Sequence, residues 1–366
     1  MAEFDFEPTI EAYCEKLAPL FQCSGDRFDF VLALLRATGH ENAGWDTLTE
    51  SWRVLDDLHY LASAELPSDY FGQPDLTRLR LRLLEYCHLV EMDAPYEIIA
   101  NLCRVKLGMP PSHFPFSTKS NQKRQSTASP RKRPAKALHP ADKISAIKAL
   151  TKKVGMANIG AAFDDFYRAG IRNAISHSDY IIHGDEFRMR NQTVPSEDGT
   201  RQRTSVIQLA RLEELINLAR AFFLAFVRVE KGARLAIGQN CGRGFPYDIR
   251  YKGILEVIVD EEKYLCGAVI HWPNGLESSY RRTSEGSRPL NVLPLDGTLQ
   301  ACPGIEHSPH DCFSPLLKPG ELHRYTPLQS RSEPLIWPNL AHDIPPDITG
   351  MPAGGTDTLA NPTHHP

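Results

Sequence analysis

The fold is decided by one stretch, residues 158–178, which reads NIGAAFDDFYRAGIRNAISHS. Its apolar and small residues recur at alternating spacings of one and three, which is typical of the buried face of a helix. This stripe is formed by Phe163, Phe166, Tyr167, Gly170, Ile171, Ala174, Ile175 and Ser178. We therefore predict one amphipathic helix over residues 158–178, with Phe166 and Tyr167 in the core.

Helical patterns also lie on both sides of this stretch. Apolar residues three and four apart occur in residues 28–35, 45–61 and 76–107, and prolines and glycines separate these segments. A second strong apolar face follows in Leu212, Leu215, Ile216, Ala219, Phe222, Phe223 and Phe226. Between the two strong helices, residues 187–194 and 203–209 predict a short hairpin around the turn Ser196-Glu-Asp-Gly-Thr. The fold class predicted is therefore mainly α, with a small insert.

Beyond Gly232 the pattern changes from helical to β-branched. Residues 254–259 and 264–271 flank a polar Asp-Glu-Glu-Lys turn, which predicts an antiparallel hairpin. From Ala301 onward, 12 of 66 residues are proline, and we expect a disordered tail. The predicted organisation is a helical region at 1–110, a basic Ser/Pro-rich linker at 111–140, core helices at 141–232, a β-rich region at 233–300 and the tail at 301–366.

The composition of the 366 residues, 42% hydrophobic and 23% charged, is that of an ordinary globular chain. No apolar run approaches the ~20 residues of a membrane span, and the acidic start MAEFDFEPTI has no signal-peptide pattern. The eight cysteines form no C-x-x-C pair, which favours reduced thiols and a cytoplasmic location. No Gly-rich phosphate loop, zincin motif or Gly-x-Ser-x-Gly elbow is present, so we expect no cofactor.

Positive charge is concentrated in residues 117–153, which carry eleven Lys or Arg residues and one acidic residue, Asp142. A basic stretch on an acidic chain suggests a polyanion partner, and the alternative is a solubilising linker. The candidate nucleic-acid-binding residues are Arg131, Lys132, Arg133 and Lys136, which also look like a nuclear-import signal.

The chemistry-bearing motif lies late in the 158–178 stretch. Arg172, Asn173 and His177 form an R-N-x-x-x-H pattern, and a polar turn, a small insert and a strongly apolar helix follow it. In this motif and this order of elements the chain resembles the HEPN superfamily over roughly 90 residues. The resemblance implies a helical bundle and, in many members, a metal-independent endoribonuclease, whereas other members are noncatalytic binding modules.

The residue types suit RNA cleavage through the 2′-hydroxyl. Histidine titrates near neutrality, so His177 can act as a general base or acid. Arg172 can meet the extra negative charge of the phosphorane with its forked donors, and Asn173 adds a neutral hydrogen bond. We therefore take Arg172, Asn173 and His177 as the candidate catalytic site of a toxin- or defence-type ribonuclease, with RNA as its partner and no metal.

Helical geometry also bears on the oligomeric state. At about 100° per residue, Asn173 and His177 lie ~40° apart, whereas Arg172 lies ~140° from His177 and is expected to point away from its own core. Such an arginine is either merely solvated or part of a site shared across a two-fold axis. The resemblance also implies composite sites, so we expect a homodimer, with an antitoxin or regulatory protein as a further candidate partner. Two alternatives stay open: a noncatalytic module that binds nucleic acid or protein, and a chain whose function lies in the β-rich region.

Other candidates have simpler explanations. Asp179, Tyr180, His183 and Asp185 follow the motif and could contact substrate, but turns and helix caps commonly use such residues. His88 is expected to be a packed helical histidine. Two thiols and two imidazoles lie within eleven residues in the tail, yet they lack the usual zinc-knuckle spacings, so we predict no metal site there. These four residues are Cys302, His307, His310 and Cys312.

Overall fold

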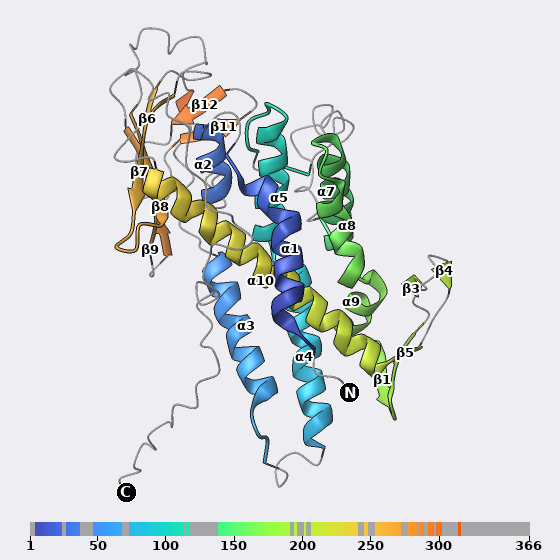
Figure 1. The fold of residues 1–366 in the computed structure, drawn as a ribbon. Helices are drawn as coiled ribbons and strands as arrows, with labels where there is room; N and C mark the ends of the chain where they lie inside the picture. The colour runs from blue at the N-terminus through green and yellow to red at the C-terminus, as the bar shows by residue number, and fades with distance from the viewer. Residues whose placement is uncertain are drawn as a thin grey trace, which may run out of the picture.

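The computed structural model of the chain describes most of the first 271 residues and several short strands beyond them. The described residues are 4–23, 27–36, 47–67, 73–112, 115–116, 138–190, 194–195, 201–202, 206–240, 245–247, 253–271, 277–283, 286–288, 292–295, 298–301 and 314–315. Their fold is mainly α, with small antiparallel sheets at two ends of a helical body (Figure 1). The prediction of a mainly α fold is thus confirmed. None of the described helices is long and apolar enough to span a membrane.

Two predicted helical segments, 28–35 and 45–61, match described helices, whereas the predicted segment 76–107 is divided into two helices by a break at Met92. The described helices follow in chain order. They are α1 (Phe6–Phe21), α2 (Arg27–Leu35), α3 (Thr47–Ser63), α4 (Pro74–Glu91), α5 (Asp93–Lys106), α7 (Pro140–Lys153), α8 (Ala157–Phe166), α9 (Ala169–Ser176) and α10 (Leu209–Asn240). Prolines help to set these boundaries: Pro74 and Pro140 occupy the first positions of α4 and α7, where a missing N–H leaves no helical hydrogen bond unmade.

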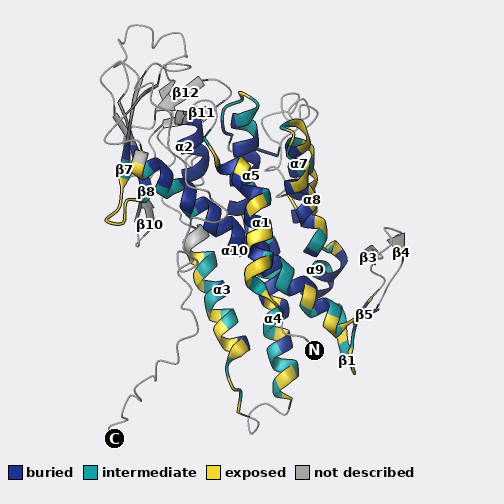
Figure 2. Ribbon diagram, viewed as in Figure 1, coloured by how far each residue is buried: buried dark blue, intermediate teal, exposed yellow. Residues whose placement is uncertain are grey.

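The core forms around α10, which crosses the middle of the helical body with α1 packed along it (Figure 1). Its central residues are buried, as Figure 2 shows. Phe222 contacts Phe163 and Phe166 of α8 with ring centroids 4.8 and 5.2 Å apart, and Tyr96 of α5 stacks on Phe163 at 5.6 Å. The two apolar faces predicted from sequence therefore pack against each other, and aromatic pairs of this kind stabilise a core beyond their buried area.

The prediction of one helix over residues 158–178 is wrong, because the chain leaves the helical conformation at Tyr167 and Arg168. The hydroxyl of Tyr86, a fully buried residue of α4, occupies the break. It donates to the carbonyl oxygen of Phe166 at 3.1 Å and accepts from the Arg168 N–H at 3.0 Å. One side chain thus satisfies the last carbonyl of α8 and a first N–H of α9. Phe166 is core as predicted, whereas Tyr167 is only partly buried.

The insert is larger than the predicted hairpin. Strand β2 (Glu186–Met189) pairs with β5 (Val206–Gln208), and β3 (Val194–Pro195) pairs with β4 (Arg201–Gln202), both antiparallel. The predicted turn at 196–200 lies outside the described residues. An additional strand, β1 (Tyr180–His183), pairs with β2 on its other side. The result is a three-stranded antiparallel sheet, β1-β2-β5, which follows α9 directly.

Helix α10 continues past Gly232, where we expected the helical region to end. Ala233, Ala236 and Ile237 are buried, and Gly238 lies so close to the Lys263 carbonyl that a β-carbon would be 1.9 Å from its oxygen. The end of α10 therefore supports the predicted hairpin, which is confirmed as β7 (Gly253–Val259) paired with β8 (Leu265–His271).

That hairpin belongs to a five-stranded antiparallel sheet of order β10-β9-β8-β7-β6. Its other strands are β6 (Phe245–Tyr247), β9 (Glu277–Thr283) and β10 (Gly286–Arg288). A third small sheet contains β11 (Val292–Leu295), β12 (Thr298–Ala301) and β13 (Ser314–Pro315). Nearly all of the predicted tail, including its Cys and His cluster at 302–312, lies outside the described residues.

Candidate functional site

The candidate site lies where α9 ends. The N–H groups of Ser178 and Asp179 donate to the carbonyls of Ile175 and Ala174 at 3.1 and 2.8 Å, which is the Schellman pattern of a helix C-terminus. Ser178 adopts a left-handed conformation with φ 55°, a position that normally takes glycine. This turn stops the helix at Ser176 and leaves His177 as the exposed capping residue.

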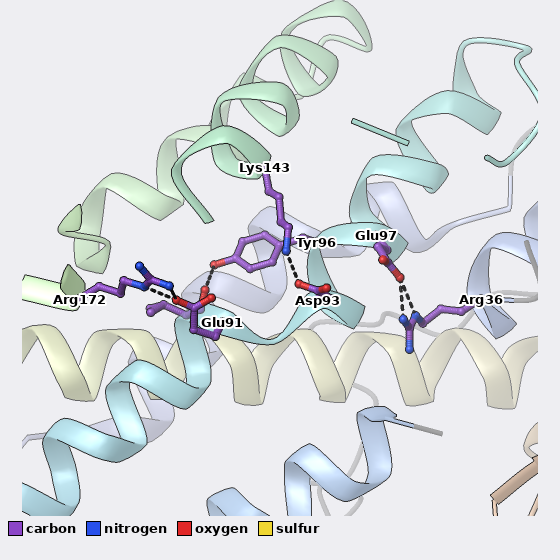
Figure 3. Close-up of polar contacts among 8 residues, drawn as sticks. Arg36, Glu91, Asp93, Tyr96, Glu97, Lys143 and Arg172 are labelled. Atoms are coloured by element: carbon purple, nitrogen blue, oxygen red, sulfur yellow. Dashed lines mark hydrogen bonds and ion pairs between the residues drawn. The ribbon is translucent and has the colours of Figure 1, made fainter. Parts of the chain in front are cut away.

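The helical wheel suggested that Arg172 points away from its own core and into solvent. In the structure it does not point into solvent. Its Nε and Nη2 atoms contact the carboxylate of Glu91, the last residue of α4, and its side chain is only 17% exposed (Figure 3). The expectation failed because α4 packs on α9 and covers the face of α9 that carries Arg172. The helical wheel gave the correct direction on α9, but that direction leads to another helix of the same chain.

Asn173 is held beside Arg172. The Nη1 atom of Arg172 donates to Oδ1 of Asn173 at 3.0 Å. A guanidinium carries five N–H donors, and contacts to Glu91 and Asn173 engage three of them. Among the described residues, two N–H groups of Arg172 therefore remain for an anion. The arginine is oriented by two neighbours and still has donors to offer, which is the arrangement expected of a phosphate-binding side chain.

Apart from Glu91, the ionisable groups beside this arginine include the Cys87 thiol and the Tyr167 hydroxyl. Burial raises the pKa of Cys87 on α4, although Arg172 opposes the shift, and its Sγ lies 3.9 Å from the Ser176 hydroxyl. Burial likewise raises the pKa of Tyr167, against the nearby positive charge of Arg172. Burial thus favours the neutral thiol of Cys87 and the neutral hydroxyl of Tyr167 beside the Arg172–Glu91 ion pair.

His177 follows Arg172 by five residues, about 7.5 Å along the helix axis. Its ring is exposed, and its described environment provides no side-chain hydrogen bond. The structure therefore brings the side chains of Arg172 and Asn173 into direct contact. It leaves the His177 ring accessible at the end of the same helix, where His177 is joined to Asn173 only through the backbone, its N–H donating to the Asn173 carbonyl at 3.0 Å.

The secondary candidates mostly serve the local structure. Tyr180 stacks on Phe187 at 4.8 Å, and the Asp179 carboxylate lies 3.6 Å from Arg190. The Asp185 carbonyl accepts from Leu209 at 2.7 Å, so Asp185 joins the insert to the start of α10. His88 lies beside the Ser51 carbonyl at 3.2 Å between α4 and α3, and burial lowers its pKa.

A pocket opens directly after the motif. It has a volume of about 330 Å³ and lies between the turn after α9 and the β1–β2 hairpin. Its walls are Ser178, Asp179, Tyr180, Ile181, Arg188, Met189 and Arg190. Two arginines, one carboxylate and two apolar side chains thus surround a cavity within the size range of small-ligand sites.

Part of the basic segment is used inside the fold. Lys143 of α7 pairs with Asp93 and is only 7% exposed, and Lys148 pairs with Asp164 (Figure 3 shows the former pair). The candidate nucleic-acid-binding residues Arg131, Lys132, Arg133 and Lys136 lie outside the described residues. In the described part of the chain, no group of three or more His, Cys, Asp or Glu side chains could hold a metal ion.

Glu91 is the functional candidate that sequence reasoning missed. It ends α4, where the helix dipole disfavours a negative charge. An acidic residue at that position is a weak signal of a partner elsewhere, but nothing in the local sequence shows that the partner is Arg172. Figure 3 shows that the α4–α5 junction repeats this device: Glu91, Asp93 and Glu97 pair with Arg172, Lys143 and Arg36, respectively.

Comparisons with protein-family models, curated proteins and solved structures found no match.

Proposed function

We propose that this chain is a metal-independent endoribonuclease of HEPN type, with Arg172, Asn173 and His177 as its catalytic residues and Glu91 as a positioning residue. The observation that carries the proposal is the arrangement of Arg172. It is held by Glu91 and Asn173, with two N–H donors that no other described residue engages, on the helix whose end presents an exposed His177.

The proposed reaction is attack of an RNA 2′-hydroxyl on its own 3′-phosphate. The oxygen–phosphorus bond forms as the bond to the 5′-oxygen of the next nucleotide breaks, which gives a 2′,3′-cyclic phosphate and a 5′-hydroxyl end. His177 takes the 2′-hydroxyl proton or gives one to the leaving 5′-oxygen. The free N–H donors of Arg172 bind the phosphoryl oxygens, whose negative charge grows in the transition state. The need for a 2′-hydroxyl makes the activity specific for RNA.

Arg172 and His177 diverge around α9, so we further propose that the active unit is a homodimer in which each site draws groups from both chains. Leu84, 52% exposed, supports an interface on α4, because it lies about 20° from Glu91 on the same helical face. An antitoxin or another regulatory protein would bind the same region, and a cytoplasmic location follows from the RNA substrate. Activity per molecule should fall on dilution below the dimer dissociation constant, whereas a fully active monomer would contradict this part of the proposal.

The alternative function is a noncatalytic module that binds RNA or protein. It is favoured by the secure pairing of Arg172 with Glu91, which resembles a structural ion pair as much as a catalytic one. In that case RNA would be retarded on a gel by the protein but would stay intact.

The test is incubation of the purified full-length protein with mixed RNA in the presence of EDTA. Cleavage products should carry 2′,3′-cyclic phosphate and 5′-hydroxyl ends. His177→Ala should reduce the rate by about 10²–10⁴-fold while the melting temperature stays unchanged, because the exposed ring makes no packing contact. His139→Ala, an exposed histidine just before α7, is the matched control. A folded His177→Ala protein that cleaves at the wild-type rate would overturn the assignment.

A further inference from the structure

The pocket after the motif lies on the outward face of the β1–β2 hairpin. The side chains on this face do not pack into the core. Along β1, Ile181 and His183 face outward, and along β2 Arg188 does so, whereas Phe187 and Met189 are buried. Cross-strand register places Ile181 opposite Arg188, and Arg188 opposite Val206 of β5. The outward face of the insert therefore presents an apolar side chain beside an arginine, next to the end of α9.

Ile181 is unusually exposed for an isoleucine, at 60%. Burying a side chain of this kind contributes about 1.5–3 kcal/mol when a partner covers it. Its position in the pocket wall, rather than alone on the surface, means that a ligand in the pocket would cover it.

The two arginines of the pocket lie at different distances from their carboxylate partners. Arg188 contacts Glu186, its neighbour on the same strand, at 2.7 Å. Arg190 lies 3.6 Å from Asp179, and its side chain is 78% exposed, so this ion pair is long and open to solvent. Exposed pairs of this kind contribute little to stability, about 0–1 kcal/mol, and an incoming anion can replace the carboxylate at small cost.

We propose that this pocket is a subsite for a nucleotide of single-stranded RNA next to the scissile phosphate. Arg190 and Arg188 bind its phosphate, and Ile181 covers its base or ribose. Asp179 accepts a hydrogen bond from a base amino or ribose hydroxyl group. The inference rests on the proposed ribonuclease function for its position in the substrate, because Ser178 of the pocket directly follows His177.

The strained turn fits this assignment. Ser178 holds φ 55° at a position where glycine would be free of strain, and its side chain lines the pocket. Glycine would remove the side chain that the pocket presents.

The test is binding of a short fluorescein-labelled 2′-O-methyl RNA of mixed sequence to the full-length protein, measured by anisotropy over a range of salt. The substituted RNA cannot be cleaved through its 2′-oxygen, so binding is measured separately from catalysis. Arg188→Ala/Arg190→Ala should weaken binding at least about tenfold and flatten the salt dependence by a slope of about 0.7 for each lost phosphate contact. Arg188→Lys/Arg190→Lys should recover most of the salt slope, because it restores the charge.

The control double variant is Lys16→Ala/Arg53→Ala, which removes two ion-paired cations far along the chain from the pocket, Arg53 exposed and Lys16 partly exposed. It should bind like the wild type. Ile181→Ser should weaken binding at an unchanged salt slope, since it removes apolar contact only.

The outcomes separate this inference from the proposed function. Pocket variants that lose RNA binding while the wild-type protein fails to cleave RNA would support the subsite and overturn the nuclease. A wild-type protein that cleaves RNA, and whose folded pocket variant binds and cleaves equally well, would overturn the subsite alone. An equal loss of binding in the control variant would also overturn the subsite. The loss would then come from the lower positive charge of the whole protein and not from the pocket.

Discussion

Two glutamates on α4 each pair with an arginine from a later helix, and the two pairs differ in their access to solvent. Glu85 and Arg220 of α10 are the buried pair, with side chains 2% and 8% exposed. Glu91 and Arg172 of α9 are the open pair, at 37% and 17%. The glutamates are six residues apart, so they point about 120° from each other, one into the body and one toward α9.

The two Glu–Arg pairs differ in their surroundings, and their surroundings give them different electrostatic properties. Around the buried pair, Arg220 also contacts His59, and Glu85 keeps one oxygen without a hydrogen-bond partner among the described residues. Burial raises the pKa of Glu85 to about 7 and lowers that of Arg220 to about 10. Desolvation thus outweighs attraction in the buried pair. The open pair is reached by solvent, and Arg172 has N–H donors that its contacts in the described part of the chain do not use, which suits binding an anion.

The largest expected effect concerns the pH dependence of stability. The folded pKa of Glu85, about 7, lies above its ordinary value of 4.5, so the folded state binds the proton more tightly than the unfolded state. The stabilisation of the folded state by this tighter proton binding is complete below pH 4.5, and it is lost as the pH rises through about 7. Relative to Glu85→Gln, the wild type should lose up to about 3 kcal/mol of unfolding free energy across that range, measured by urea denaturation.

A parallel pH profile of the wild type and Glu85→Gln would show that Glu85 does not titrate in the folded protein. It would also remove the contrast between the buried and the open pair.

The next effect concerns catalysis. Glu91→Gln leaves Arg172 without its charged partner, so the guanidinium should lose its fixed orientation and kcat should fall about 10–100-fold with little change in KM. Glu85→Gln is the matched control on the same helix and should leave kcat unchanged. Single-turnover cleavage together with melting temperatures gives the comparison. A Glu91→Gln protein with unchanged or raised kcat would mean that Glu91 only competes with phosphate for Arg172.

The smallest effect concerns the turn beside the open pair. Ser178→Gly should relieve the left-handed backbone strain and raise the unfolding free energy by up to about 1 kcal/mol. Gly184→Ala, at φ 60° in the β1–β2 turn, is the reverse change and should destabilise the protein. If Ser178→Gly destabilised the protein, the serine side chain would have a structural role that its contacts do not show.

The sequence was sufficient for the apolar faces and insufficient for the polar contacts. Phe163, Phe166 and Phe222 could be assigned to the core because a helical period identifies a buried face without its partner. The break at Tyr167 could not be predicted, because it depends on the hydroxyl of Tyr86, about eighty residues earlier in the chain. Likewise α10 passes Gly232 because a later hairpin covers it.

The candidate site shows the same division. Arg172, Asn173 and His177 form a recognisable motif at the end of one helix, so spacing alone identifies them as one candidate set. The direction of Arg172 depends on which helix packs against α9, and Glu91 belongs to α4, which is separated from the motif by the basic linker. Neither is encoded locally, so neither the orientation of the arginine nor its partner could be read from the motif.

The central claim is that the open pair does chemistry and the buried pair does not. The most direct measurement is RNA cleavage per folded molecule by Arg172→Lys and Arg220→Lys, with melting temperatures recorded for both. Lysine keeps the charge and loses the forked donors. We predict that Arg172→Lys cleaves about 10²–10³-fold more slowly at an unchanged melting temperature, whereas Arg220→Lys melts earlier and keeps its cleavage rate. An Arg172→Lys protein that is folded and cleaves like the wild type would contradict the account.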